Sequence, residues 1–141
     1  MEGLQHIAPV GITQMVILKL AFCAMVAILF LQSGLSKVFG WKGEKDWLTG
    51  HFAKSPLHGL VPIMLTAITI VEVCAGTLAL LGLPEGLLRW GTGFGGLGML
   101  LGTGAIILLF FGQRVAKDYT GAASLIPYFL MCAAGLYLYS A

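Results

Sequence analysis

Four long runs of apolar residues, separated by shorter polar segments, divide the chain. The runs cover about residues 14–39, 60–83, 90–112 and 119–139. Each is long enough to cross a hydrocarbon core of about 30 Å as an α-helix, which rises about 1.5 Å per residue. The pattern therefore predicts an all-α integral membrane protein whose four spans form a single domain over residues 1–141.

Short links between the later runs favour an antiparallel arrangement. Residues 82–86 have the glycine and proline content of a tight turn, and residues 113–118 form a short charged connection. Helices joined by short links pack as antiparallel neighbours. We expect a compact antiparallel four-helix bundle.

The longest polar segment, residues 40–60, separates the first two spans. Within it, residues 44–54 can form a short helix with Trp47, Leu48, His51 and Phe52 on one face. An aromatic and apolar face on an otherwise charged helix is typical of a segment that lies in the membrane interface. The sequence predicts a short interfacial helix between spans one and two.

Composition supports the membrane class and excludes several others. Apolar residues make up 58% of the chain and charged residues only 10%, whereas soluble domains are roughly a quarter charged. The net charge of +2 is small, and no basic run is interleaved with aromatic residues, so a nucleic-acid partner is not expected. Membrane lipid and other membrane subunits are the expected partners, and a homo-oligomer remains open.

Cysteines and histidines do not form a recognisable metal or redox site in the sequence. Cys23, Cys74 and Cys132 each lie alone in an apolar run, where cysteine usually packs as a small apolar residue. His51 and His58 lie outside the spans, so they cannot ligate a haem inside the bundle. We expect no metal and no intrinsic cofactor.

Lysine and arginine predict the orientation of the spans. Most of these residues lie in the loops at 40–60 and 113–118, and cytoplasmic loops carry an excess of them. Both loops are therefore expected in the cytoplasm, with both termini outside.

Glu72 is the acid at the centre of the second span. A charged group at that depth costs roughly 2.5–3.5 kcal/mol on insertion scales unless it is paired. The candidate companions are polar residues at the end of the first span, Gln32, Ser33 and Lys37, and counting residues inward from the span ends favours Gln32 over Lys37 as nearest neighbour. This group could be a buried network that fixes helix packing, or a pocket for a quinone headgroup or a proton path, with Asp118 and Tyr119 at its mouth.

The third span is rich in glycine. Gly91, Gly93 and Gly96 match a dinucleotide-binding spacing, but the strand that this motif requires is not predicted. The glycines instead form two G-x-x-x-G pairs, in which small residues let helices approach closely. We expect packing within the bundle, or at a dimer face, by Gly91, Gly95, Gly98 and Gly102.

Three short motifs resemble the DoxX-like family of small membrane proteins. They are Gln32-Ser33-Gly34-x-x-Lys37; Glu72 with Gly76 and Leu81-Gly82-Leu83; and Arg114-x-x-x-Asp118-x-x-Gly121-Ala122-Ala123. The resemblance spans about residues 14–139. It implies a four-span protein of the bacterial cytoplasmic membrane, similar to the small membrane subunits of a thiosulfate:quinone oxidoreductase, with Ser33, Lys37, Glu72 and Asp118 at signature positions.

Three functions remain open at this stage. The first is a subunit of a membrane redox complex that contacts quinone and receives electrons from a partner. The second is a non-enzymatic accessory or scaffold subunit of a larger membrane assembly. The third, a small transporter with Glu72 as the coupling acid, is the least favoured, because four spans leave little room for alternating access.

Overall fold

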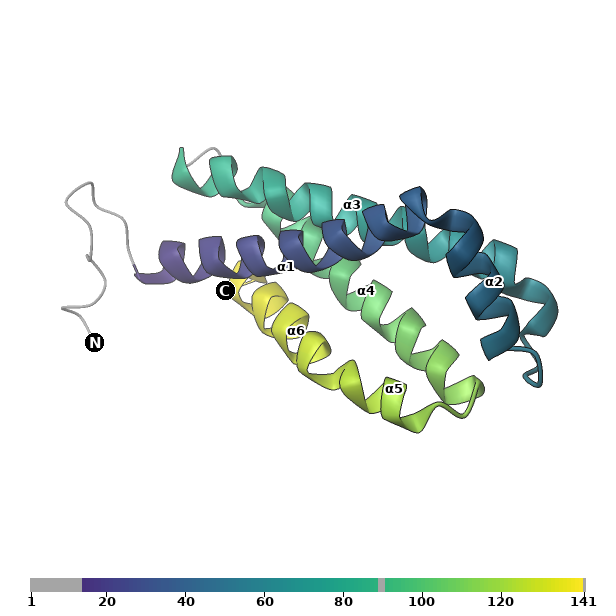
Figure 1. Cartoon of the computed structure of the whole chain (residues 1–141). Helices are drawn as coiled ribbons and strands as arrows, with labels where there is room; N and C mark the ends of the chain where they lie inside the picture. Colours follow the sequence, from purple (N-terminus) through teal and green to yellow (C-terminus); the bar gives the residue numbers. More distant parts are fainter. Residues whose placement is uncertain (1–13, 89–90, 141) are drawn as a thin grey trace.

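The computed structural model describes residues 14–88 and 91–140, and all regular secondary structure in those ranges is helical (Figure 1). The elements are α1 (Gln14–Phe39), α2 (Trp41–His51), η2 (His58–Leu60), α3 (Val61–Leu87), α4 (Gly93–Val115), α5 (Tyr119–Ser124) and α6 (Ile126–Ser140). Residues 1–13 and 141 lie outside the described residues, as do Arg89 and Trp90 near the expected start of the third span.

Four helical segments in these ranges are long and apolar enough to cross a membrane: Gln14–Phe39, His58–Leu87, Gly93–Val115 and Tyr119–Ser140. They match the four predicted spans to within a few residues. Large apolar side chains such as Ile28, Ile63 and Phe111 are more than half exposed on the outer surface. In a membrane protein, this surface is the one that lipid covers.

The helix α3 continues where the sequence predicts a turn. Residues 82–86 are helical, and α3 passes through Pro84 to Leu87. Proline inside a helix costs one backbone hydrogen bond. Here Leu88 still closes the last turn through a bond to the Pro84 carbonyl, and the buried Glu85 remains in helical geometry. The expectation of a turn at 82–86 is therefore wrong.

The fourth span contains an interruption. Leu125 separates α5 from α6, two residues before Pro127. Proline cannot donate to the carbonyl four residues earlier and disfavours helical geometry in the residue before it. The Leu125 backbone N–H instead donates to the carbonyl of Ala122, three residues earlier.

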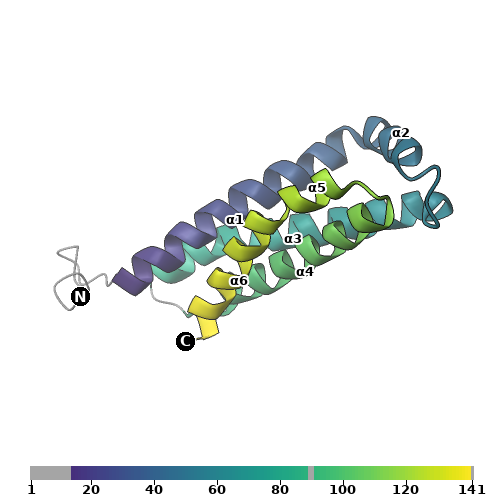
Figure 2. The same ribbon diagram turned by 90° about the horizontal axis from the view of Figure 1, so that it is seen from below.

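The short helix α2 lies at one end of the long helices in both views (Figures 1 and 2). It covers Trp41–His51, beginning three residues earlier than predicted, and Phe52 is its C-cap residue. Phe52 is buried, whereas Trp47 is 60% exposed. At the opposite end, α6 finishes beside α1, where the Cys23 sulfur and the Tyr139 hydroxyl are 2.9 Å apart.

The core lies where α1, α3, α4 and α6 meet. Its fully buried side chains come from all four helices and include Cys23 and Phe30 of α1, Leu65 of α3, Met99 of α4 and Cys132 of α6. Two of the three cysteines therefore serve as small packing residues, and Cys74 is exposed on the outer surface.

Candidate functional site

Two glycines let α1 and α3 approach closely and so form the candidate site. A Cβ atom on Gly34 would lie 2.7 Å from the Val73 side chain, and one on Gly76 would lie 2.8 Å from the Leu31 backbone nitrogen. Side chains larger than hydrogen do not fit at such separations. This close contact places the last turns of α1 against the middle of α3, where Glu72 lies.

Glu72 is completely buried and paired with Lys37. The Lys37 ammonium lies 3.2 Å from Glu72 Oε1 and 3.3 Å from Oε2, and it also donates to the Ser33 hydroxyl at 2.8 Å. The Lys37 side chain retains 15% exposure. Ser33 and Lys37 are one turn apart, so they share a face of α1 that is directed at the acid.

The two carboxylate oxygens of Glu72 are not equivalent. Oε2 accepts a hydrogen bond from Lys37, whereas Oε1 is within ionic range of the same ammonium but accepts no aligned hydrogen bond from the described part of the chain. Buried carboxylate oxygens normally accept hydrogen bonds, and each exception calls for a physical explanation. Oε1 is the one such buried side-chain atom among the described residues.

The expectation that Gln32 would be the nearest companion of Glu72 is wrong. The Gln32 amide instead donates to Ser36 at 3.4 Å on an exposed part of α1. Counting residues from the span ends assumed that α1 and α3 end at the same level. They are staggered: Val73 is the thirteenth residue of α3, but only five residues of α1 follow its contact, Gly34. The stagger brings Lys37, close to the end of α1, level with the acid.

Asp118 and Tyr119 do not join this group through any contact among the described residues. Asp118 caps α5, because its carboxylate accepts from the Gly121 backbone N–H at 2.9 Å. Tyr119 is exposed, and the Arg114 guanidinium lies 4.6 Å from the centre of its ring. Of the polar residues that the sequence assigns to one pocket, Ser33, Lys37 and Glu72 form one cluster and Asp118 belongs to a second. Gln32 and Tyr119 are exposed and join neither.

The second cluster links α2 to the start of α5. His51 Nε2 lies 2.7 Å from Gln113 Oε1 and 3.7 Å from Asp118 Oδ2. His51 also stacks on Trp47 with ring centres 4.6 Å apart. His58 is not part of it, since its ring bonds to the Ser55 carbonyl. The two histidines between α1 and α3 therefore have separate surroundings.

Sequence reasoning missed Glu85, a second buried acid. Its carboxylate oxygens accept from the backbone N–H groups of Phe94 and Gly95 at 3.0 and 3.1 Å. These N–H groups belong to the first turn of α4, which has no intrahelical acceptors for them and carries partial positive charge. The available signal was an acid eight residues before the start of α4, close enough along the chain to reach the free N–H groups of its first turn.

Three of the four glycines singled out in the third span pack tightly. A Cβ atom on Gly95 would collide with Tyr139, one on Gly98 would lie 2.8 Å from the Ala79 backbone nitrogen, and one on Gly102 would lie 2.9 Å from Phe30. Gly91 differs, because nothing lies within 4 Å and its φ of 153° favours glycine. The contacts made by Gly95, Gly98 and Gly102 are with helices of the same chain.

Comparison with known proteins adds no relative. No family model, curated protein or solved structure matches this chain. Function must therefore be argued from the two polar clusters themselves. The Lys37 ammonium can donate to a carbonyl, and the Glu72 carboxylate can accept a proton or a hydroxyl hydrogen bond.

Proposed function

We propose that the protein is a small multi-pass subunit of a membrane redox complex and that it contacts quinone beside Ser33, Lys37 and Glu72. The observation that carries the proposal is the unfilled Glu72 Oε1 next to a lysine that keeps partial exposure. The Lys37 ammonium can donate a hydrogen bond to a quinone carbonyl. The Glu72 carboxylate can accept a hydrogen bond from the hydroxyl of the reduced form. Intramembrane ionisable pairs often mark such sites.

The resemblance to DoxX-like proteins supports the same reading, because Ser33, Lys37 and Glu72 occupy its motif positions. Among the described residues, no three His, Cys, Asp or Glu side chains are grouped as potential metal ligands. In this proposal, electrons come from a partner subunit, and this chain supplies the quinone contact and the proton-exchanging groups.

The proposed membrane arrangement is an antiparallel bundle in the bacterial cytoplasmic membrane, with α2 in the interface. In support, Gly34 contacts Val73 whereas Cys23, earlier in α1, contacts Gly82, later in α3. Contacts whose numbers run in opposite directions are those of antiparallel neighbours. The charged loops next to α2 and α5 are proposed to be cytoplasmic, as the excess of lysine and arginine favours.

A scaffold function is the second candidate, and one observation favours it. Glu72 is fully buried and already paired with Lys37, so the pair satisfies most of its own polar groups. A buried ion pair can serve to specify which helices pack together. In that case the site would hold α1 on α3 without contacting a ligand.

The change Glu72→Gln separates the two functions. It keeps the shape of the side chain but removes the charge and half of the acceptor capacity. The redox proposal expects the purified protein to bind the reduced quinone probe decyl-benzoquinol roughly ten- to a hundredfold more weakly, because the hydrogen bond from its hydroxyl to a charged carboxylate contributes about 1.5–3 kcal/mol.

The matched control is Glu44→Gln, at a partly exposed position of α2 outside the Lys37–Glu72 pair, which should leave quinone binding unchanged. Both variants are first checked for an unchanged elution profile in detergent. Equal quinone binding by folded Glu72→Gln and native protein would contradict the quinone contact and leave the scaffold function as the better account.

A further inference from the structure

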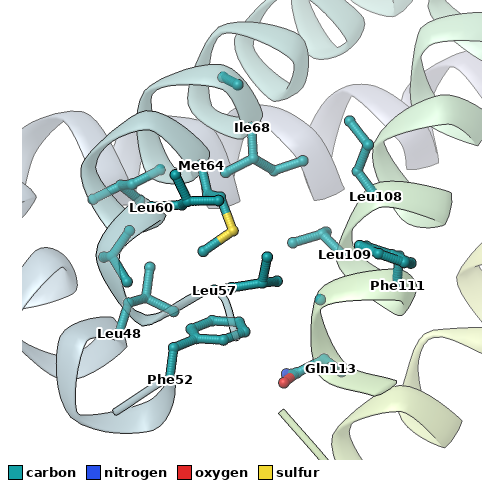
Figure 3. Close-up of a pocket in the computed structure, with 14 residues that line it drawn as sticks. Leu48, Phe52, Leu57, Leu60, Met64, Ile68, Leu108, Leu109, Phe111 and Gln113 are labelled. Atoms are coloured by element: carbon teal, nitrogen blue, oxygen red, sulfur yellow. The ribbon is translucent and has the colours of Figure 1, made fainter. Parts of the chain in front are cut away.

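A cavity of about 340 Å³ lies between α2, η2, α3 and α4. Its lining is apolar except at one residue, Gln113. Figure 3 shows Gln113 and Phe52 at one end of the cavity, and Ile68 and Leu108 at the other. Its volume is within the range of about 300–1,000 Å³ typical of small-molecule sites, which are mostly apolar with a few placed polar groups.

The amide of Gln113 is hydrogen-bonded to His51. With the amide oxygen Oε1 facing His51, the 2.7 Å contact requires His51 Nε2 to carry the proton, because an amide oxygen can only accept. The amide nitrogen then remains a donor, and it makes no hydrogen bond to the described residues. It lies beside Gly121, where a Cβ atom would approach to 2.9 Å.

The histidine that orients this amide is itself positioned from two sides. Trp47 stacks on its ring, and the Asp118 carboxylate lies 3.7 Å from Nε2. Asp118 is fixed in turn by its hydrogen bond to the Gly121 backbone. The cavity therefore ends at an amide side chain whose position is set by supporting contacts, as in built binding sites.

We propose that this cavity binds a single-chain amphiphile whose headgroup carries a carbonyl, with the chain between α3 and α4 and the carbonyl accepting from Gln113. At about 340 Å³ the cavity is at the small end of the range of ligand sites, which favours one chain over the paired chains of a phospholipid. The single polar side chain provides one hydrogen bond to a neutral headgroup. This site is separate from the Lys37–Glu72 pair and does not depend on the quinone proposal. A lipid ester and a quinone both carry this chemistry, so the experiment includes both.

The test is photolabelling of the full chain in detergent with a monoacylglycerol that bears a diazirine near the end of its chain. Mass spectrometry should find the label on cavity-lining residues such as Met64 and Leu108. The change Ala67→Phe, which adds a ring to the cavity lining, should abolish this labelling. Its matched control is Ala21→Phe on the exposed surface of α1, which should label like the native protein.

A second variant tests the headgroup contact. Gln113→Leu should reduce labelling at a limiting probe concentration roughly two- to tenfold, the effect of one neutral hydrogen bond. Competition by decyl-benzoquinone would identify a quinone as an accepted ligand, and competition by unlabelled monoacylglycerol alone would identify a lipid ester. Labelling spread over the outer surface, or labelling equal in native protein, Ala67→Phe and Gln113→Leu, would overturn the proposal.

Discussion

At the scale of single residues, Lys37 is the group on which the buried acid depends. The Glu72 carboxylate has no exposure, and among the described residues its contacts with charge all come from this one ammonium. Removing water from a charge is costly, and the attraction of a close partner offsets that cost only while the partner is present. The two residues must therefore be considered as a unit.

We predict that Lys37→Met will destabilise the protein by roughly 3–5 kcal/mol, the usual cost of leaving one member of a buried pair behind. The double change Lys37→Met with Glu72→Leu removes both charges and should restore most of that stability. Reversible unfolding in mixed micelles measures both. A double variant as unstable as Lys37→Met would show that the pair does not act as a unit.

At the scale of helices, small residues determine how close the elements lie. Gly98 of α4 faces the backbone of Ala79 on α3, whereas Gly104, six residues further along α4, has nothing within 4 Å of a Cβ position. Both glycines lie inside the same apolar helix, so the side chains and backbone packed against them are what distinguish them. This gives a matched pair within a single helix.

We predict opposite outcomes for alanine at these two sites. Gly98→Ala should cost about 1–3 kcal/mol, because a Cβ atom 2.8 Å from a backbone nitrogen forces α3 and α4 apart. Gly104→Ala should be neutral or stabilising by up to about 1 kcal/mol, since alanine favours helix. The same micelle unfolding assay compares them, and equal effects would contradict the α3–α4 contact.

At the scale of the whole molecule, the charged side chains of the loops gather at the end of the long helices where α2 lies. This end carries Lys42, Lys45 and Lys54 around α2, and Arg114 and Lys117 before α5. The described residues at the other end, where α6 finishes beside α1, include Lys19 but no comparable group. The asymmetry is the basis of the proposed orientation.

We predict that Lys45→Cys, in a variant whose three native cysteines are replaced by alanine, will react with an impermeant maleimide only after cells are permeabilised. Ser140→Cys is the control at the opposite end and should react in intact cells. Labelling of Lys45→Cys in intact cells would reverse the orientation without affecting the fold.

The sequence by itself determined the number, length and approximate limits of the spans, because long apolar runs have few alternatives to membrane-spanning helices. It also singled out Ser33, Lys37 and Glu72, since polar groups in such runs are conspicuous. It did not determine which of them meet. That depended on the stagger of α1 against α3, set by Gly34 and Gly76 at their contact.

Only the tertiary structure decided the remaining contacts. Asp118 lies near His51 and Gln113, and not near Glu72, because the ends of α2 and α4 meet beside it. Glu85 lies in a continuing helix rather than a turn, because the first turn of α4 presents N–H groups that its carboxylate accepts. Local sequence specifies helices through backbone hydrogen bonds within each segment. Contacts between helices depend on side-chain shape and relative offset, which no single segment encodes.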